Sequence, residues 1–213
     1  MSFAIPHIIV TAGPTHEPID PVRYIANRSS GKQGFAIASA LAAKGAKVTL
    51  IAGPVTLDTP PGVTRIDVQT ARDMAAAVEA ALPADAAIMV AAVADWRVES
   101  AAQKIKKDGS GVMPTLTLVE NPDILATLAR SPQRPRLLIG FAAETENVIE
   151  NAKAKLARKG CDWIVANDVS GDVMGGAANT VHVVTSDGVE NWETMAKGEV
   201  AERLASRVLG TLQ

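Results

Sequence analysis

The chain has 213 residues, of which 47% are hydrophobic and 21% charged, and this composition predicts a single soluble domain with a sizeable core. Its formal net charge of −2 excludes a general polyanion-binding surface, so no nucleic-acid partner is expected. One cysteine excludes an intramolecular disulfide framework. The start of the sequence is not signal-like and no apolar run approaches about 18 residues, so neither secretion nor a membrane span is implied and we expect a cytoplasmic protein.

Strands and helices are predicted to alternate along the chain. β-Branched and apolar runs bounded by turn residues indicate the strands, and apolar residues at helical spacing followed by glycine indicate the helices. In chain order, we expect a strand at 7–11, a helix at 33–44, strands at 47–51 and 64–68, a helix at 70–82, strands at 86–93 and 115–119, a helix opened by 121–123, a strand at 137–142, a helix at 147–159, strands at 162–166 and 181–185, and a closing helix at 193–209.

This alternation predicts an α/β fold with a mainly parallel, Rossmann-like sheet that has helices on both faces. Residues 1–213 are expected to form one domain, with a basic flap at about 98–113. Ligands of such sheets bind beyond the carboxyl ends of the strands, where the strand order reverses. Gly13, Asp95, Glu144 and Asn167 each follow a predicted strand, so the site is expected there.

The loop at 27–34 leads into the first predicted helix and is a candidate phosphate site. Free amides and the helix dipole favour an anion at such a place. Ser29 and Ser30 add hydroxyl donors, Gly31 permits close backbone approach, and Gly34 lets the helix start pack near the sheet. An ordinary helix start with glycines for turn geometry is the alternative.

Known nucleotide-binding patterns do not match this loop, since it is neither a P-loop nor a GxGxxG fingerprint. The second strand ends at Gly53-Pro54, where an NAD-binding fold would place an acidic residue for the ribose. A short-chain oxidoreductase would need a tyrosine–lysine pair, and the only tyrosine, Tyr24, lies outside one. A nicotinamide-dependent enzyme is therefore disfavoured, while a nucleotide-sensing module without turnover stays open.

Basic residues occur in two further places. Lys104, Lys106 and Lys107 on the flap could stabilise charge on a polyphosphate, although a solvated basic loop has the same composition. Lys155 and Lys159 share one helical face, where cations also complement the helix dipole. Neither group identifies a ligand by itself.

Single residues give weaker signals. Asp95 could bind a ribose, a base edge or a metal ion, or cap a turn, and Phe141 could be a core aromatic or the wall of a base pocket. His16 and His182 lack partners at metal-ligand spacing, and Cys161 is expected to be a buried apolar residue. Without a visible nucleophile–base triad, positioning and electrostatics are the expected means of catalysis.

Several blocks of the sequence, in the same order and over nearly the whole chain, resemble those of phosphopantothenate–cysteine ligases of the bacterial, CTP-using kind. The blocks are TAGPT at 11–15, DPVRY at 20–24, NRSSGK at 27–32, AAVADWR at 91–97, KIKK at 104–107, NPDI at 121–124, GFAAET at 140–145 and ANDV at 166–169.

The resemblance implies a reaction of coenzyme A biosynthesis in two halves. The carboxylate of 4′-phosphopantothenate attacks the α-phosphate of CTP and gives an acyl-cytidylate and pyrophosphate. The amine of cysteine then displaces CMP and forms the amide. A Mg²⁺ ion is expected to bridge the triphosphate, with no dedicated protein ligands for the metal.

Site residues follow from the same resemblance, position by position. Lys104 is expected to stabilise the nucleotidyl transfer, and Asn27 to act in the acyl-nucleotide half-reaction. Arg23, Arg28 and Asn167 are expected to contact substrate. The expected nucleotide-binding residues are Gly13, Ser29, Ser30, Gly31, Gly34, Ala91, Asp95, Asn121, Pro122, Asp123, Ile124, Phe141, Lys155 and Lys159.

In many bacterial relatives this module is the C-terminal half of a bifunctional protein, whose N-terminal half is a flavin-dependent decarboxylase. We expect this chain to be the ligase domain of such a fused protein and not to bind FMN itself. Gln33 stands where relatives often carry methionine, a change that is expected to be tolerated. The resemblance also implies a homodimer in which each partner completes the substrate site of the other.

Overall fold

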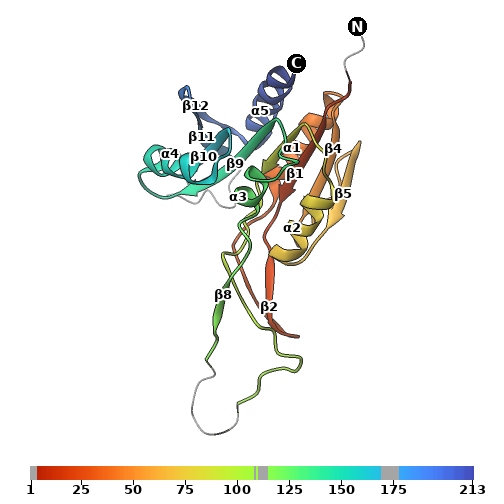
Figure 1. Ribbon diagram of the computed structural model, residues 1–213, viewed down its shortest axis with the longest axis vertical. Coiled ribbons are helices and arrows are strands. Elements are labelled where there is room, and N and C mark those ends of the chain that lie inside the picture. Colours follow the sequence, from red (N-terminus) through yellow and green to blue (C-terminus); the bar gives the residue numbers. More distant parts are fainter. Residues whose placement is uncertain (1–3, 108, 110–114, 169–177) are drawn as a thin grey trace.

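The computed structural model describes residues 4–107, 109, 115–168 and 178–213, which form an eight-stranded sheet flanked by helices and a long arm (Figure 1). The strands are β1 (His7–Ala12), β2 (His16–Asp20), β3 (Arg23–Ala26), β4 (Lys47–Ala52), β5 (Val63–Asp67), β6 (Ala86–Met89), β7 (Trp96–Val98), β8 (Leu118–Glu120), β9 (Leu137–Glu144), β10 (Trp163–Asp168), β11 (Ala178–Thr185) and β12 (Gly188–Ala196). The helices are α1 (Lys32–Ala43), α2 (Ala71–Ala80), α3 (Ile124–Ala129), α4 (Val148–Lys159) and α5 (Lys197–Leu212).

The central sheet is mainly parallel, which confirms the predicted fold class. Its order is β5-β4-β1-β6-β9-β10-β11-β12, with parallel pairing from β5 to β10 and antiparallel pairing of β11 with both neighbours. Counted along the chain, the parallel strands have the order 3-2-1-4-5-6, which is typical of Rossmann folds. The order reverses between β1 and β6, so a ligand is expected beyond the carboxyl ends of these two strands.

Helices cover both faces of the sheet, as predicted. Alternate residues of a strand point to opposite faces, so Ile8 and Val10 of β1 belong to a core with α1 and α5, and Ile9 to a core with α2, α3 and α4. Capping residues set several helix ends. Thr70 accepts a hydrogen bond from Asp73 N in a capping box, and Gly160 ends α4 with a positive φ of 68°.

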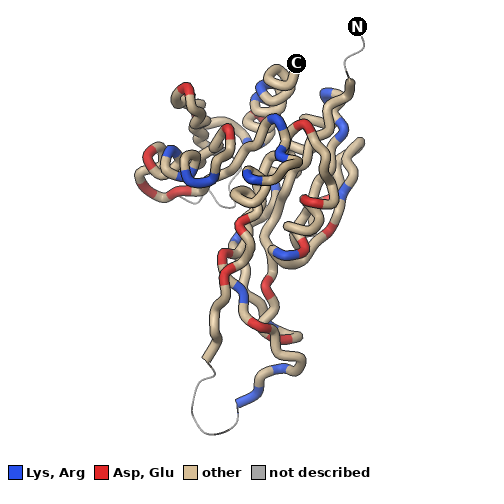
Figure 2. The backbone as a smooth tube through the Cα atoms, viewed as in Figure 1, with Lys and Arg blue, Asp and Glu red and all other residues tan. Residues whose placement is uncertain are grey.

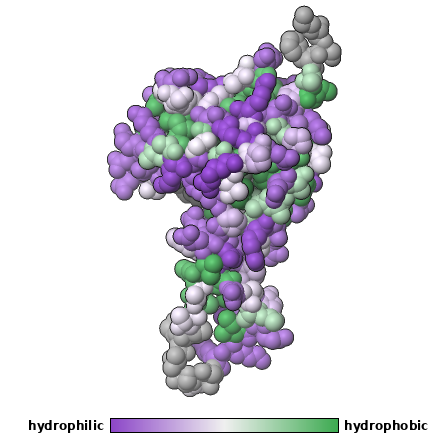
Figure 3. Space-filling model, in the orientation of Figure 1, coloured by the Kyte–Doolittle hydropathy of each residue, from purple (hydrophilic) through white to green (hydrophobic). Residues whose placement is uncertain are grey.

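An arm of two short ribbons, β2 with β3 and β7 with β8, extends away from the sheet (Figure 1). The sequence analysis treated residues 12–32 as a loop and expected no strand at β7, and both expectations are wrong. Apolar side chains are exposed on the arm, where Figure 3 shows hydrophobic surface: Val22 60%, Tyr24 55%, Trp96 52% and Leu118 53%. The described part of the basic flap lies on this arm, whereas residues 108 and 110–114 fall outside the described residues.

Three predicted boundaries also differ from the structure. β6 ends at Met89, because the residues after it bond to the end of β1 and to the loop that follows β1. Residues 193–196 belong to β12, and the closing helix begins only at Lys197, since pairing with β11 overrides the helix propensity of this short segment. Pro122 precedes the N-cap Asp123 and is not the first helical residue.

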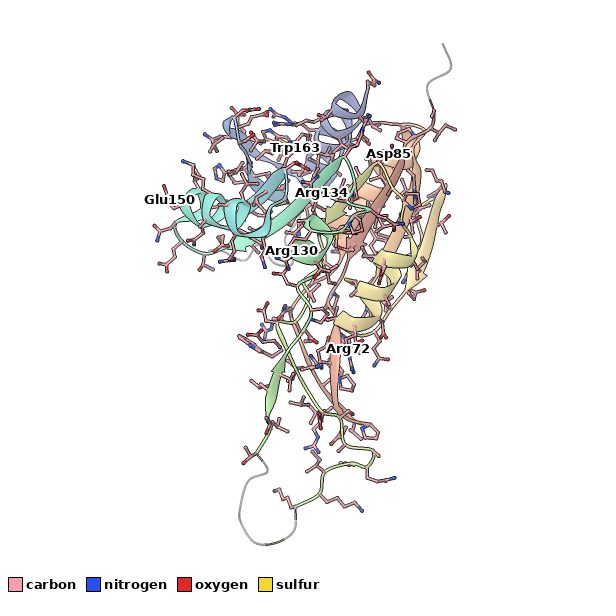
Figure 4. All side chains as sticks on the ribbon, in the orientation of Figure 1. Arg72, Asp85, Arg130, Arg134, Glu150 and Trp163 are labelled. Atoms are coloured by element: carbon pink, nitrogen blue, oxygen red, sulfur yellow. The ribbon has the colours of Figure 1, made fainter. Side chains whose placement is uncertain are left out.

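A salt bridge fastens the loop before β9 to the start of β10. Arg134, labelled in Figure 4, donates two hydrogen bonds of 3.0 Å to the carboxylate of Asp162, which also accepts a bond of 2.7 Å from Leu138 N. This bidentate contact holds two neighbouring strands of the sheet at the end opposite the site. No helix among the described residues is long and apolar enough to cross a membrane.

Candidate functional site

A cleft of about 760 Å³ lies at the carboxyl ends of the central strands, where the strand order reverses. It is bounded by the loop at 27–34, the segments at 89–96 and 120–125, the end of β9 and one face of α4. This is the position that the topology predicts for a ligand.

Two buried threonines shape the wall of the cleft that follows β6. Thr11 Oγ1 accepts a hydrogen bond of 3.2 Å from Ala91 N, and Thr15 Oγ1 accepts one of 3.0 Å from Ala94 N. These bonds take residues 90–95 out of the sheet and across the end of β1. Neither threonine was singled out from the sequence. Thr11 ends a β-branched run and has the appearance of an ordinary strand residue, and Thr15 follows Gly13-Pro14 and has that of an ordinary turn residue.

The start of α1 faces the cleft with amides that no side chain caps. The N-cap is Gly31, in a left-handed conformation with φ 72°, and it provides no side-chain hydrogen bond. Ser29 Oγ accepts only a long contact of 3.4 Å from Gly31 N. The positive φ of Gly31 fits the alternative in which glycine serves turn geometry, and the first-turn amides, which no side chain caps, are available to an anion.

Gly34 allows α1 to approach β1. A Cβ atom at Gly34 would lie 2.6 Å from Ala12 Cβ and 3.2 Å from Thr11 O, distances at which the helix must shift. We expect Gly34→Ala to lower the free energy of unfolding by about 1–3 kcal/mol. Urea denaturation measures this change.

Gly210→Ala is the matched control, since Gly210 lies in α5 and a Cβ there meets nothing within 4 Å. We expect this substitution to raise stability by up to about 1 kcal/mol. Equal stability of the wild type and Gly34→Ala would contradict the proposed packing.

Asn27 connects the arm to the wall after β6. Its Nδ2 donates to Val93 O at 3.0 Å and to Ala92 O at 3.4 Å. The side chain is exposed to the cleft, and its Oδ1 accepts no hydrogen bond from the described residues. Asn27 is thus held in one orientation beside the space in which a ligand would lie.

Lysines of α4 form a cationic part of the cleft. Lys155 Nζ donates to Phe141 O at 2.7 Å, and burial, together with the nearby charge of Lys159, lowers the pKa of Lys155. Lys159 forms an ion pair with Asp123, which also caps α3 through Ala126 N at 3.1 Å. Burial alone would raise the pKa of Asp123, but the hydrogen bonds from Lys159 and Ala126 bring it below its ordinary value. Both lysines line the cleft, so their role is not limited to complementing the dipole of α4.

Two amide oxygens in this region have no protein partner. Asn121 Nδ2 donates to Ala94 O at 2.9 Å and Asn121 N donates to Asp95 O at 2.8 Å, so the Asn121 side chain stabilises the loop that carries Asp95. Asn121 Oδ1 and Asn167 Oδ1 are buried without a hydrogen bond from the described residues. Unsatisfied acceptors of this kind are favoured where a ligand or water supplies the donor.

Most of the residues singled out from the sequence come together at the cleft. Those that line it are Gly13, Asn27, Arg28, Ser29, Ser30, Gly31, Gly34, Ala91, Asp95, Asn121, Pro122, Asp123, Ile124, Phe141, Lys155, Lys159 and Asn167. The sequence analysis missed Lys32, Trp96, Glu120 and Lys197, which also line it.

Arg23 and Lys104 lie on the arm and do not line the cleft of their own chain. Arg23 forms an ion pair with the buried Asp20 and donates to Ile105 O at 2.9 Å, while Ile105 N donates to Asp20 Oδ2 at 3.1 Å. The Arg23 guanidinium holds the pKa of Asp20 well below its usual range. This network fixes the backbone next to Lys104, whose side chain is exposed in the basic segment near the far end of the arm (Figure 2).

Three residues weighed from the sequence do not line the cleft, namely His16, His182 and Cys161. His16 stacks on Tyr24 with ring centroids 4.0 Å apart, and His182 Nδ1 lies 2.7 Å from Asn191 Oδ1. Cys161 is buried, as predicted, and burial raises the pKa of its thiol. Among the described residues, no group of three or more His, Cys, Asp and Glu side chains is arranged to hold a metal ion.

Comparison with known proteins gives matches over nearly the whole chain. A family model described as the DNA/pantothenate metabolism flavoprotein C-terminal domain matches residues 3–212. The Coenzyme A biosynthesis bifunctional protein CoaBC of Haemophilus influenzae is 47% identical over 210 residues, which are 97% of this chain and 52% of that protein. The chain spans about half the length of the curated relatives it matches.

Solved structures share the fold. The crystal structure of the C-terminal domain of Coenzyme A biosynthesis bifunctional protein CoaBC is 39% identical with a TM-score of 0.82, and the match covers 97% of this chain and 95% of that one. A Cab2 mutant in complex with phosphopantothenate-cysteine has a TM-score of 0.77 over 97% of this chain and 86% of that one. At 16% identity, the second likeness concerns the fold alone.

Proposed function

The chain belongs to the family of the DNA/pantothenate metabolism flavoprotein C-terminal domain, and from this we propose that it is the ligase that joins cysteine to 4′-phosphopantothenate in coenzyme A biosynthesis. The observation that carries the proposal is the near-complete match, at 39% identity, to the C-terminal domain of CoaBC. A Cab2 mutant with the same fold forms a complex with phosphopantothenate-cysteine, which is the product expected of this reaction.

The proposed co-substrate is CTP. A carboxylate is a poor acyl donor, so an oxygen of the pantothenate carboxylate attacks the α-phosphorus, the bond to the β-phosphate breaks, and pyrophosphate leaves. The cysteine amine then attacks the acyl carbon of the acyl-cytidylate, loses a proton and expels CMP. Both steps develop negative charge on oxygen, which positioned amides and cations stabilise.

Residues of the cleft can divide this work. The free amides at the start of α1 suit the triphosphate, and Lys155 and Lys159 add positive charge from α4. Phe141, whose backbone oxygen accepts a hydrogen bond from Lys155 Nζ, also lines the cleft and could offer its ring to a base. Asn27, tethered at Val93 O, is available to the acyl group of the intermediate. We therefore propose that Asn27 acts in the second half-reaction, in which the cysteine amine displaces CMP.

In this scheme, a Mg²⁺ ion would bind together with the nucleotide and not at a separate protein site. The described residues offer it no cluster of acidic and histidine ligands, and Asp123 is already engaged by Lys159. Asp95 and Glu120 are exposed carboxylates that also line the cleft. When bound, the ion would neutralise phosphate charge, with phosphate oxygens and water as its main ligands.

The arm supports a homodimer as part of the proposal. Its exposed apolar side chains, including Tyr24, Trp96 and Leu118, are typical of an interface. Pairing of two arms would cover them and could carry Lys104 and Arg23 to the cleft of the partner, whereas Arg28 already lines its own cleft. A fusion to a flavin-dependent decarboxylase, as the relatives' greater length suggests, is also proposed.

The test is turnover by the purified chain. Incubation with CTP, Mg²⁺, 4′-phosphopantothenate and cysteine should release CMP and pyrophosphate in equal amounts and form the amide. Leaving out cysteine should limit pyrophosphate release to about one equivalent per site, because the acyl-cytidylate cannot proceed. Binding of CTP without release of either product would overturn the ligase and favour a nucleotide-sensing module.

A further inference from the structure

Two lysines without acidic partners, Lys32 and Lys197, line the same cleft. They are the first residues of α1 and α5, and neither forms an ion pair with a described residue. A cation at a helix start opposes the helix dipole, which favours acidic residues there. The first turn of α1 holds no acidic residue to offset this conflict, whereas the first turn of α5 holds Glu199. A cation at a helix start is expected where a ligand supplies negative charge.

Packing of α1 against α5 holds the two lysines on one side of the cleft. Gln33 Nε2, next to Lys32, donates to Lys197 O at 3.2 Å, which ties the two helix starts together. Lys32 is exposed and Lys197 is half-buried. Burial lowers the pKa of Lys197, and the charge of Lys32 lowers it further. Repulsion between the two lysine charges therefore costs free energy, which a bound anion would offset.

This pair differs from the lysines of α4. Lys155 and Lys159 come from the helix on the other face of the sheet, and both already contact protein oxygens, at Phe141 O and on Asp123. Lys32 and Lys197 instead border the free amides of α1. The cleft therefore has a second cationic region, whose two lysines form no ion pair with the described residues.

We propose that Lys32 and Lys197 are positioning residues that together hold a phosphoryl group of a substrate, namely the pyrophosphate portion of the nucleoside triphosphate. The identity of the nucleotide rests on the proposed function, whereas the binding of inorganic pyrophosphate does not. The adjoining amides of α1 favour the nucleotide over the phosphate of 4′-phosphopantothenate, because they add donors for a polyanion. In this arrangement the leaving pyrophosphate stays paired with cations while its bond to the α-phosphate breaks.

Calorimetric titration of the full chain tests the proposal with three probes: inorganic pyrophosphate, CMP and 4′-phosphopantothenate. Lys197→Met should weaken pyrophosphate binding by roughly 10- to 100-fold, the loss expected for one charged contact. CMP affinity should stay within about twofold, since CMP lacks the phosphates concerned. Lys197→Arg should restore most of the affinity, and the matched control Lys153→Met, at an exposed position of α4 outside the cleft, should change none of the three.

Thermal stability separates this role from a structural one. Loss of an unpaired, half-buried charge should leave the melting temperature of Lys197→Met unchanged or higher. Unchanged pyrophosphate affinity would overturn the proposal, and so would an equal loss for pyrophosphate and CMP. A loss confined to 4′-phosphopantothenate would overturn the assignment to pyrophosphate. Because no probe has to react, a chain without ligase turnover would still give a clear result.

Discussion

Replacing Lys104 with glutamine is expected to lower the turnover number by about 10²- to 10³-fold, the effect of removing one group that stabilises a charged transition state. Glutamine keeps a polar side chain of similar reach but cannot supply the positive charge that nucleotidyl transfer needs. Stability should be unaffected, because the Lys104 side chain is exposed and the adjacent backbone is held by Asp20 and Arg23 through Ile105.

Release of pyrophosphate and CMP measures the loss, with circular dichroism as the check on folding. Lys153→Gln is the matched control, since it removes the same charge from an exposed position of α4 outside the cleft. We expect the control to retain turnover within about threefold, as for other exposed charges away from the reacting atoms. Near-normal turnover of Lys104→Gln would remove Lys104 from the mechanism.

The position of Lys104 in the fold limits how it can reach a substrate, and the sequence did not reveal that position. Lys104 lies on the arm and does not line the cleft of its own chain. Sequence resemblance identified the residue but not its position, because the arm consists of short strands whose burial depends on distant segments. β2 contains Pro18 together with the buried acids Glu17 and Asp20, a pattern that does not predict a strand.

Pairing of the buried acids explains why this strand forms. Glu17 Oε1 accepts a hydrogen bond of 2.8 Å from Ala71 N, at the start of α2, and Asp20 is paired with Arg23. These partners lie up to 54 residues away in sequence, beyond the reach of periodicity. The parallel sheet was predictable because each of its inner strands is a local apolar run ended by a turn.

Among the residues of the cleft, too, the sequence predicts those with a local pattern and misses those that are brought there by contacts between distant segments. Gly31 and Gly34 were found from the sequence because a glycine-rich loop before a helix has a local physical meaning. Lys197 was missed, since the closing helix was expected from residue 193 and a lysine within a helix carries no signal. Its place in the cleft depends on the packing of α5 against α1, which only the three-dimensional arrangement shows.

Asn27→Asp is expected to reduce amide formation by about 10²- to 10³-fold while pyrophosphate release continues for one turnover per site. The Asn27 amide donates to Val93 O and Ala92 O, and a carboxylate at this position has no proton to donate. Its charge would also oppose the oxyanion that forms when the cysteine amine attacks the acyl carbon. The acyl-cytidylate should therefore accumulate.

Rapid quenching followed by mass spectrometry would detect that intermediate. Asn191→Asp makes the same chemical change at an exposed position of β12 outside the cleft, and it should leave amide formation unchanged. If Asn27→Asp loses pyrophosphate release as well, the residue acts in the first half-reaction, and the assignment of Asn27 to the second half-reaction is wrong.

Combining the two variants in one dimer shows whether Lys104 acts in the cleft of its own chain or in that of the partner. Mixing and re-pairing Lys104→Gln with Asn27→Asp chains makes half of the dimers mixed. If Lys104 acts in the cleft of the partner, each mixed dimer contains one site with both residues intact, and about one quarter of the wild-type activity should return. If Lys104 acts in its own cleft through a movement of the arm, every site has one altered residue and no activity returns. The arm geometry favours the first result, because the network of Asp20, Arg23 and Ile105 fixes the segment beside Lys104 to the arm.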